Sequence, residues 1–342
     1  MIKRIGKRTL ALENRPYLLG HAAAVGKKEG EGPLGERFDY VAKNDRMGQR
    51  SWELAESELQ KTAIRLALRK ATLPERSLDL ILAGDLLNQC IGSFLASMHA
   101  NVPYLGQYGA CSTMAQGLAL GGCLVESGAA DRLLAAASSH FCSAERQYRF
   151  PLAYGGQRTP TAQWTATAAG AAVLGSEPVP NGAEPCDVRV THVLFGRMVE
   201  MGVRDAANMG AAMAPAACDT ILAHFRDTGR SSSYYDLVVT GDLGALGSRI
   251  LKDLTWEKGV DLHDNHVDCG EIVYKVIEDE FQGGSGAGCS AVVLNSYLLH
   301  KMRQREIKRI LFAATGALLS TVSSGQGESI PCVSHAVSLE LV

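Results

Sequence analysis

Short apolar runs, rather than alternating ones, mark the strands of this chain. Residues 78–83, 133–137 and 237–240 are almost continuously aliphatic. Strands of a parallel sheet have this pattern, because helices cover both faces of the sheet. Stretches with a helical pattern, over 57–71 and 212–228, precede two of these runs. The pattern therefore predicts an α/β fold built around a buried sheet.

The same order of elements occurs twice along the chain, which indicates a duplicated α/β unit. Three pieces recur in the same order. DLILAGDL (79–86) recurs as DLVVTGDL (236–243). The segment around Cys111 recurs around Cys289, and RLLAAA (132–137) recurs as RILFAA (309–314).

The repeat divides the chain into an N-terminal half, 1–196, and a C-terminal half, 197–342. Residues 141–167 form a long excursion in the first half. Long loops of this kind are usually functional. The alternating residues 335–342 predict a strand that closes the second half.

Composition narrows the function. The chain has 342 residues, 46% of them hydrophobic, and a formal charge of −2, which argues against nucleic acid as a partner. No apolar run reaches 18 residues and no signal peptide is expected, so the protein should be soluble when isolated. The nine cysteines form no CxxC pair. We therefore expect no zinc site and no cofactor, and mostly buried, reduced thiols.

Cys111 stands in Tyr-Gly-Ala-Cys-Ser-Thr, at the turn from a strand into a helix of small residues. A cysteine at such a turn, in a duplicated chain, resembles the nucleophile position of the thiolase-type fold. The resemblance implies a five-layer αβαβα fold of two pseudo-symmetric halves. We expect the helices that follow Cys111 and Cys289 to lie antiparallel at its centre, packed through small residues.

A more specific resemblance covers almost the whole chain. The chain resembles the stage V sporulation protein AD family of spore-forming Firmicutes, whose members are thiolase-like. The segments that carry the resemblance are DLILAGDLLN (79–88), YLGQYGACST (104–113), SSHFCSAERQYR (138–149), TPTAQWTATAAG (159–170), MGAAMAPAACDT (209–220), GGSGAGCSA (283–291) and ATGALLS (314–320).

This resemblance implies binding of dipicolinic acid, pyridine-2,6-dicarboxylate, as the free acid or its calcium chelate. It also implies service in the stage V sporulation A channel, which takes up this compound in sporulation and releases it in germination. The other channel subunits would be partners. The protein would then lie peripherally on the spore inner membrane, attached through those subunits, because no anchor is expected.

The alternative function is an acyl-CoA condensing enzyme of the thiolase or ketoacyl synthase type that uses Cys111. Such enzymes need bases around the thiolate. The positions that would carry His or a second Cys are Gly241-Asp242-Leu243, Gly283-Gly284-Ser285 and residues 313–317, which contain neither. We therefore expect no enzyme activity. Cys111 is then either a structural thiol or a pocket residue that touches a ligand.

Candidate ligand residues follow from the chemistry of a dicarboxylate. Arg146 and Arg149 lie three residues apart and would form a clamp if they share a helical face, or else would be solvated or paired. His140 would donate to a carboxylate or serve the structure. Asp85 would contact the calcium of a chelate, or cap a strand end as its repeat Asp242 would.

The edge strand predicts how the protein associates. Condensing-enzyme folds pair edge strands across a twofold axis, and residues 101–105, shortly before Cys111, are the expected edge. Closed twofold dimers are also the commonest oligomers, so a homodimer is expected.

Overall fold

The structure is a computed structural model that describes residues 1–148, 159–178, 187–274 and 282–342. The described part of the main sheet has thirteen strands, and ten of them form two groups of five that meet at one residue pair, Arg189 with Tyr17. The first group runs β3 (Tyr17–Val25), β9 (Ala168–Gly175), β7 (Arg132–Ser139), β5 (Leu80–Gly84) and β6 (Tyr104–Gly106). The second runs β10 (Val188–Leu194), β15 (Cys332–Leu341), β14 (Arg309–Ala317), β11 (Leu237–Thr240) and β12 (His266–Asp268).

The two groups have the same pairing pattern. In each, the three strands farthest from the junction are parallel, and the fourth is antiparallel to its neighbours. The recurring sequence pieces fall on equivalent strands, β5 with β11 and β7 with β14. This confirms the duplication predicted from the sequence.

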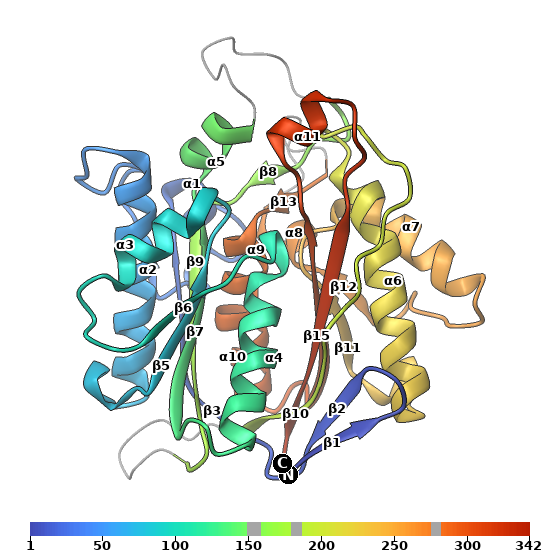
Figure 1. Ribbon diagram of the computed structural model, residues 1–342, viewed down its shortest axis with the longest axis horizontal. Helices are drawn as coiled ribbons and strands as arrows, with labels where there is room; N and C mark the ends of the chain where they lie inside the picture. The colour runs from blue at the N-terminus through green and yellow to red at the C-terminus, as the bar shows by residue number, and fades with distance from the viewer. Residues whose placement is uncertain (149–158, 179–186, 275–281) are drawn as a thin grey trace.

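Helices complete five layers, as expected (Figure 1). The outer layer of the first half contains α2 (Trp52–Lys70) and α3 (Ile91–Ser97), and that of the second contains α6 (Met209–Thr228) and α7 (Gly244–Trp256). The central layer contains α4 (Thr113–Glu126) and α9 (Ala287–Val293), which continues through one π-helical turn into α10 (Leu299–Arg303). The smaller elements are β1 (Ile2–Ile5), β2 (Thr9–Leu12), α1 (Lys27–Gly30), β4 (Tyr40–Val41), α5 (Phe141–Tyr148), β8 (Trp164–Thr165), α8 (Cys269–Val273), β13 (Gly284–Ser285) and α11 (Thr321–Gly325).

The outer helices begin and end at residues suited to these positions. The side chain of Ser51 accepts a hydrogen bond from the Leu54 N–H at the start of α2, and Asn208 caps α6 in the same way. Helix α6 ends at Gly229, whose φ of 69° is accessible to glycine at little cost. Both helices therefore begin a few residues before their predicted starts at 57 and 212.

The direction of the central helices was predicted wrongly. The Ser290 hydroxyl donates to the Cys111 carbonyl, and Asn295 lies beside the Met114 sulfur. Residues later in the second helical segment therefore lie beside residues later in the first. The two helices are therefore parallel. The reason is that each follows the carboxyl end of a strand in its own half, and both ends lie on the same side of the molecule (Figure 1).

Two segments connect the predicted halves. The excursion 141–167 contains α5 and β8; Phe141 stacks on Trp164, and β8 pairs with β13 of the second half. Strand β10, at the end of the first half by the 1–196 boundary, pairs over six residues with β15 of the second group. The boundary at residue 196 stays a prediction.

Small residues bring the central helices close to the sheets rather than to each other. A Cβ on Gly121 of α4 would lie 2.7 Å from Leu133 Cδ1 of β7. A Cβ on Gly170 of β9 would lie 2.6 Å from the Ala291 carbonyl oxygen of α9. Gly170 faces backbone and therefore requires glycine, whereas at Gly121 the end of the Leu133 side chain would have to shift.

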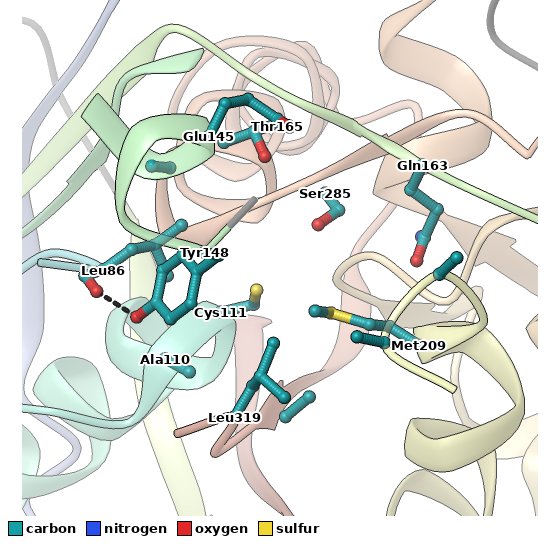
Figure 2. Close-up of a pocket in the computed structure, with 14 residues that line it drawn as sticks. Leu86, Ala110, Cys111, Glu145, Tyr148, Gln163, Thr165, Met209, Ser285 and Leu319 are labelled. Carbon is teal, nitrogen blue, oxygen red and sulfur yellow. Dashed lines mark hydrogen bonds between the residues drawn. The ribbon is translucent and has the colours of Figure 1, made fainter. Parts of the chain in front are cut away.

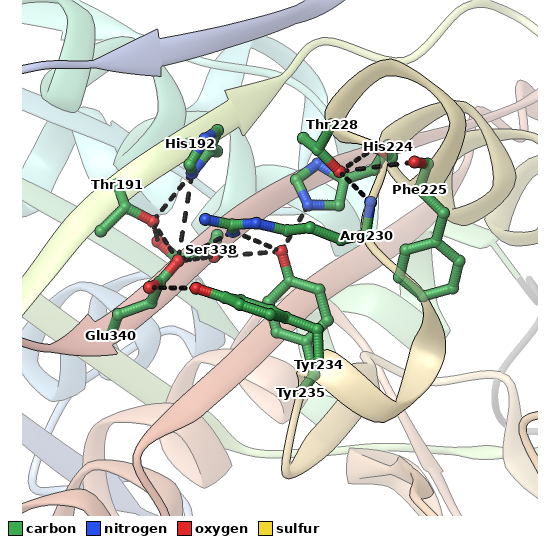
Figure 3. Close-up of polar contacts among 10 residues, drawn as sticks. All are labelled: Thr191, His192, His224, Phe225, Thr228, Arg230, Tyr234, Tyr235, Ser338 and Glu340. Atoms are coloured by element: carbon green, nitrogen blue, oxygen red, sulfur yellow. Dashed lines mark hydrogen bonds and ion pairs between the residues drawn. The ribbon is translucent and has the colours of Figure 1, made fainter.

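A buried polar network holds the C-terminal strand β15 against the end of α6 (Figure 3). The Arg230 guanidinium donates to Glu340 Oε1 at 2.9 Å and to the Tyr235 hydroxyl at 2.9 Å. Glu340 also accepts from the hydroxyls of Thr191 at 2.6 Å and Tyr234 at 3.0 Å. The Glu340 carboxylate is thus satisfied although it is nearly buried.

Candidate functional site

A pocket of about 590 Å³, including its open mouth, lies over the amino-terminal end of α4, between the two halves (Figure 2). Its walls are mainly apolar, and its floor carries a thiol, a hydroxyl and an amide. The lining residues are Leu86, Ala110, Cys111, Ala144, Glu145, Tyr148, Gln163, Thr165, Ala206, Ala207, Met209, Ser285, Ala317 and Leu319.

Cys111 lies at the floor because the chain turns sharply before it. Ala110 has a φ of 48°, a left-handed conformation that is costly for a non-glycine residue and typical of functional turns. The thiol contacts the Asp242 carboxyl, the Ser285 hydroxyl and the backbone of Gly286. Burial raises the pKa of Cys111 well above its usual range, and the neighbouring Asp242 raises it further. The floor therefore presents a thiol rather than a nucleophilic thiolate.

Asp242 is the acidic neighbour of Cys111 and follows directly after β11 and Gly241. It is fully buried, and the Gly286 N–H donates to its Oδ2 at 3.4 Å. The Gln163 amide donates to its backbone carbonyl. Burial raises the pKa of the Asp242 carboxyl well above its usual range, while the Cys111 thiol counteracts this rise. An uncharged acid thus stands beside an uncharged thiol.

Asp85 occupies the repeat position of Asp242 but has a different environment. Its Oδ1 accepts from the Leu87 N–H at 2.8 Å and its Oδ2 from the Ser93 N–H at 2.7 Å. It is fully buried and is not among the pocket-lining residues. This geometry is that of a strand-end cap, the second of the two roles predicted for Asp85.

His140 also lies away from the pocket lining. Its Nδ1 accepts from the Cys142 N–H at 3.1 Å, so its Nε2 donates to the Asp45 carbonyl at 2.8 Å. Burial lowers the pKa of the imidazole. Both ring nitrogens thus serve the local structure, and the ring packs against Trp52 with centroids 5.5 Å apart.

The predicted arginine clamp is not assembled by the described residues. Arg146 on α5 forms an ion pair with Glu53 of α2 and lines a separate surface pocket. Arg149 lies outside the described residues. Of the four predicted ligand residues that the structure describes, only Cys111 lines the main pocket.

Sequence reasoning missed several pocket residues. Gln163 and Ser285 come from segments that pair in space, since β8 and β13 are adjacent parallel strands. Asp242, which contacts the Cys111 thiol without lining the pocket, was interpreted as a strand-end cap by its symmetry with Asp85. The signal available was its position after a strand end, where open α/β sheets bind ligands.

The comparisons decide the family. The chain matches stage V sporulation protein AD (SpoVAD) over residues 6–340. The chain belongs to the SpoVAD family. It is 42% identical to stage V sporulation protein AD of Bacillus subtilis strain 168 over 339 residues, which cover 99% of this chain and 98% of the relative.

Solved structures show the fold of this SpoVAD family member. A 3-oxoacyl-[acyl-carrier-protein] synthase III from Aquifex aeolicus is 14% identical with a TM-score of 0.57, covering 95% of this chain and 99% of that one. Cerulenin-bound OleA from Xanthomonas campestris is 16% identical with a TM-score of 0.57, covering 95% and 98%. These similarities confirm the predicted thiolase-like architecture and, at such low identity, nothing beyond the fold.

The described residues contain neither a helix suited to cross a membrane nor a cluster of side chains suited to hold a metal ion. No helix there combines the length and apolar character of a membrane crossing. No group of three or more His, Cys, Asp or Glu side chains there is arranged to hold a metal ion.

Proposed function

We propose that this SpoVAD family member binds dipicolinic acid, free or as its calcium chelate, in the pocket over Cys111, and that it has no condensing activity. The observation that carries the proposal is the environment of Cys111. The residues in contact with its thiol are Asp242, Ser285 and Gly286, and no His lines the pocket among the described residues. A nucleophile without a base loses several orders of magnitude in rate.

The pocket suits a small planar acid. Leu86, Leu319 and Met209 supply apolar contacts for a ring, while Ser285 and Gln163 supply polar groups for a carboxyl. In this arrangement the ring lies between the walls and one carboxyl points to the floor.

In a calcium chelate, we expect the cation to contact a different residue from the one predicted from the sequence. Asp85 has both oxygens engaged by backbone N–H groups. Glu145 lines the pocket, and carboxylate oxygens are preferred calcium ligands. We therefore assign the contact with the chelated calcium to Glu145 rather than Asp85.

The family supports a role in sporulation, and we propose that the protein serves the channel that moves dipicolinate across the spore inner membrane. In this role it lies peripherally on that membrane and is held by other channel subunits. Expressed alone, it should stay in the supernatant after ultracentrifugation. Equal recovery with spore membranes after deletion of those subunits would contradict this attachment.

We also propose a homodimer through an edge surface that consists of Phe94, Met98, Leu105 and Tyr108. These side chains are 46%, 51%, 47% and 41% exposed, and β6 is the last strand of its group in the described sheet. Residues 86–125 contain no Asp, Glu, Lys or Arg. Interface cores are depleted of charge, and an uncharged surface meets its own copy across a twofold axis without repulsion.

The decisive experiment is calorimetric titration with dipicolinate, with and without calcium, and with pyridine-2-carboxylate as the monocarboxylate control. We expect dipicolinate to bind and Cys111→Ala to weaken binding. A protein that binds neither form would overturn the proposal.

The second candidate function is the acyl-CoA condensing enzyme that uses Cys111. The fold of the condensing enzymes favours it, and Cys111 stands at the start of α4 beside the pocket. Incubation with acyl-CoA followed by mass spectrometry separates the two functions. Acyl transfer to Cys111 supports the enzyme, and an unmodified protein supports the binding role.

A further inference from the structure

Tyr108 connects the edge surface to the wall of the pocket. Its hydroxyl lies 2.7 Å from the Tyr148 hydroxyl and 3.2 Å from the Leu86 carbonyl oxygen. The Tyr148 hydroxyl also contacts the Leu86 carbonyl, and both Leu86 and Tyr148 line the pocket (Figure 2). Each hydroxyl has one hydrogen, so one tyrosine donates to the other, which in turn donates to the Leu86 carbonyl. The Tyr108 hydroxyl belongs to this chain in either order.

The segment that follows Leu86 depends on such contacts. Gln89 and Cys90 have φ values of 58° and 53°, two successive left-handed conformations without glycine, which persist only where the surroundings enforce them. The Gln147 side chain accepts from the Asn88 N–H at 3.0 Å and donates to the Leu86 carbonyl at 3.3 Å. Helix α5 and Tyr108 therefore hold this strained pocket wall in place.

A second connection lies beside the first. The Cys90 thiol donates to the carbonyl of Gln107, the residue before Tyr108, at 3.3 Å. Two residues after Tyr108, the chain reaches Ala110 and then Cys111 at the pocket floor. Tyr108 is therefore linked to both the wall and the floor of the pocket.

We propose that a second copy of this chain docked on the edge surface and a ligand in the pocket stabilise each other through the Tyr108 hydroxyl. This inference rests on the proposed function. Contact with the second copy orders Tyr108, and the ordered hydroxyl fixes Tyr148 and Leu86 in the conformation that encloses a ligand. Because coupling between two binding events is reciprocal, dipicolinate must tighten the dimer by the same factor that dimerisation tightens dipicolinate.

The test compares Tyr108→Phe, which keeps the ring and removes the hydroxyl, with Met98→Glu, which places like charges opposite each other across the twofold axis. Sedimentation of the wild type should show a dimer whose Kd falls about tenfold with saturating dipicolinate. Tyr108→Phe should dimerise as the wild type does, with a ligand effect below about twofold. Met98→Glu should be monomeric and bind dipicolinate about tenfold more weakly.

Several results would overturn the coupling. They are an undiminished ligand effect in Tyr108→Phe, wild-type affinity in monomeric Met98→Glu, or a wild type that is monomeric at every concentration. The last result leaves dipicolinate binding intact, so it contradicts the coupling without contradicting the ligand.

A dimer that does not bind dipicolinate would contradict the proposed function instead. Hydrogen exchange then tests the dimer's effect on the pocket wall without any ligand. Backbone amides of residues 86–90 should exchange faster in Met98→Glu than in the wild-type dimer. Equal exchange would overturn the role of Tyr108.

Discussion

The thiol of Cys111 lies against the carboxyl group of Asp242, although 131 residues (242 − 111) separate them in the chain. The two groups come from non-equivalent positions in opposite halves, Cys111 from the turn before α4 and Asp242 from the end of β11, and the fold brings them together. Burial raises the pKa of both groups, and Asp242 raises that of the Cys111 thiol further, whereas the thiol partly counteracts the rise at Asp242. This relationship distinguishes the pocket from a site built for nucleophilic attack.

Cys111 should therefore be unreactive toward iodoacetamide at pH 8. Its raised pKa leaves a very small thiolate fraction, and the thiolate is the reacting species. Mass spectrometry of the intact protein and its peptides would measure modification at each cysteine. The half-buried Cys142 serves as an internal reference and should react faster. Equal rates at the two sites would show that Cys111 is ionised.

Arg146→Ala should leave dipicolinate affinity within about twofold of the wild type, because its guanidinium pairs with Glu53 away from the main pocket. The loss of stability should stay below about 1 kcal/mol, as for a partly exposed ion pair. Arg149→Ala should weaken dipicolinate much more than pyridine-2-carboxylate, because a second cation recognises the second carboxylate. Calorimetry of both variants with both ligands would distinguish the roles of the two arginines. A large loss of dipicolinate affinity in Arg146→Ala would support the predicted clamp by both arginines.

Glu56→Gln should change how stability depends on pH. Burial, with a further contribution from Asp85, raises the pKa of Glu56 from 4.5 to about 8. Between these values the folded state holds a proton that the unfolded state has released, so this group makes stability fall as pH rises from 4.5 to about 8. Glutamine keeps the hydrogen bonds with Ser138 and Ser143 but does not titrate.

Denaturant unfolding at pH 5 and pH 8 would check this prediction. The variant should gain stability relative to the wild type at pH 8 and change little at pH 5. A difference that is the same at both pH values would show that Glu56 is ionised in the folded protein.

Gly170→Ala should destabilise the protein by about 1–3 kcal/mol, the usual cost of overpacking. Its Cβ would lie 2.6 Å from the Ala291 carbonyl oxygen, and neither β9 nor α9 has room to move within the central layer. Gly325→Ala in α11 is the control, since nothing lies within 4 Å of its Cβ. Urea unfolding should separate the two, and equal stability would show that the layers can move apart.

Arg230→Met should destabilise the fold by about 3–5 kcal/mol, because removal of one partner leaves the other charge buried. The remaining charge is Glu340, whose side chain is 11% exposed and which Arg230 contacts at 2.9 Å. The double variant Arg230→Met with Glu340→Gln should recover much of the loss. A double variant no more stable than the single one would show that the arginine acts through packing on Tyr234 instead.

The fold could be predicted from the sequence because the duplicated unit shows the same local pattern at two places in the chain. The strand pieces at 79–86 and 236–243 carry local signals, namely unbroken apolar runs that end in Gly-Asp. The helix direction at the centre was not accessible in this way. It depends on which side of the molecule each strand ends, a property of two halves folded together.

In the candidate site, too, some features could be predicted from the sequence and others depend on the tertiary structure. The sequence by itself determined the duplicated α/β architecture and the position of Cys111 at a strand-to-helix turn, because both depend on local patterns of apolar and small residues. Only the tertiary structure decided that Asp242 rather than Asp85 reaches the thiol. The two aspartates occupy equivalent positions, but Ser93 and Leu87 engage the carboxylate of Asp85, whereas α9 directs Asp242 toward Cys111. Symmetric sequence positions became chemically different because the chain packs different neighbours against each.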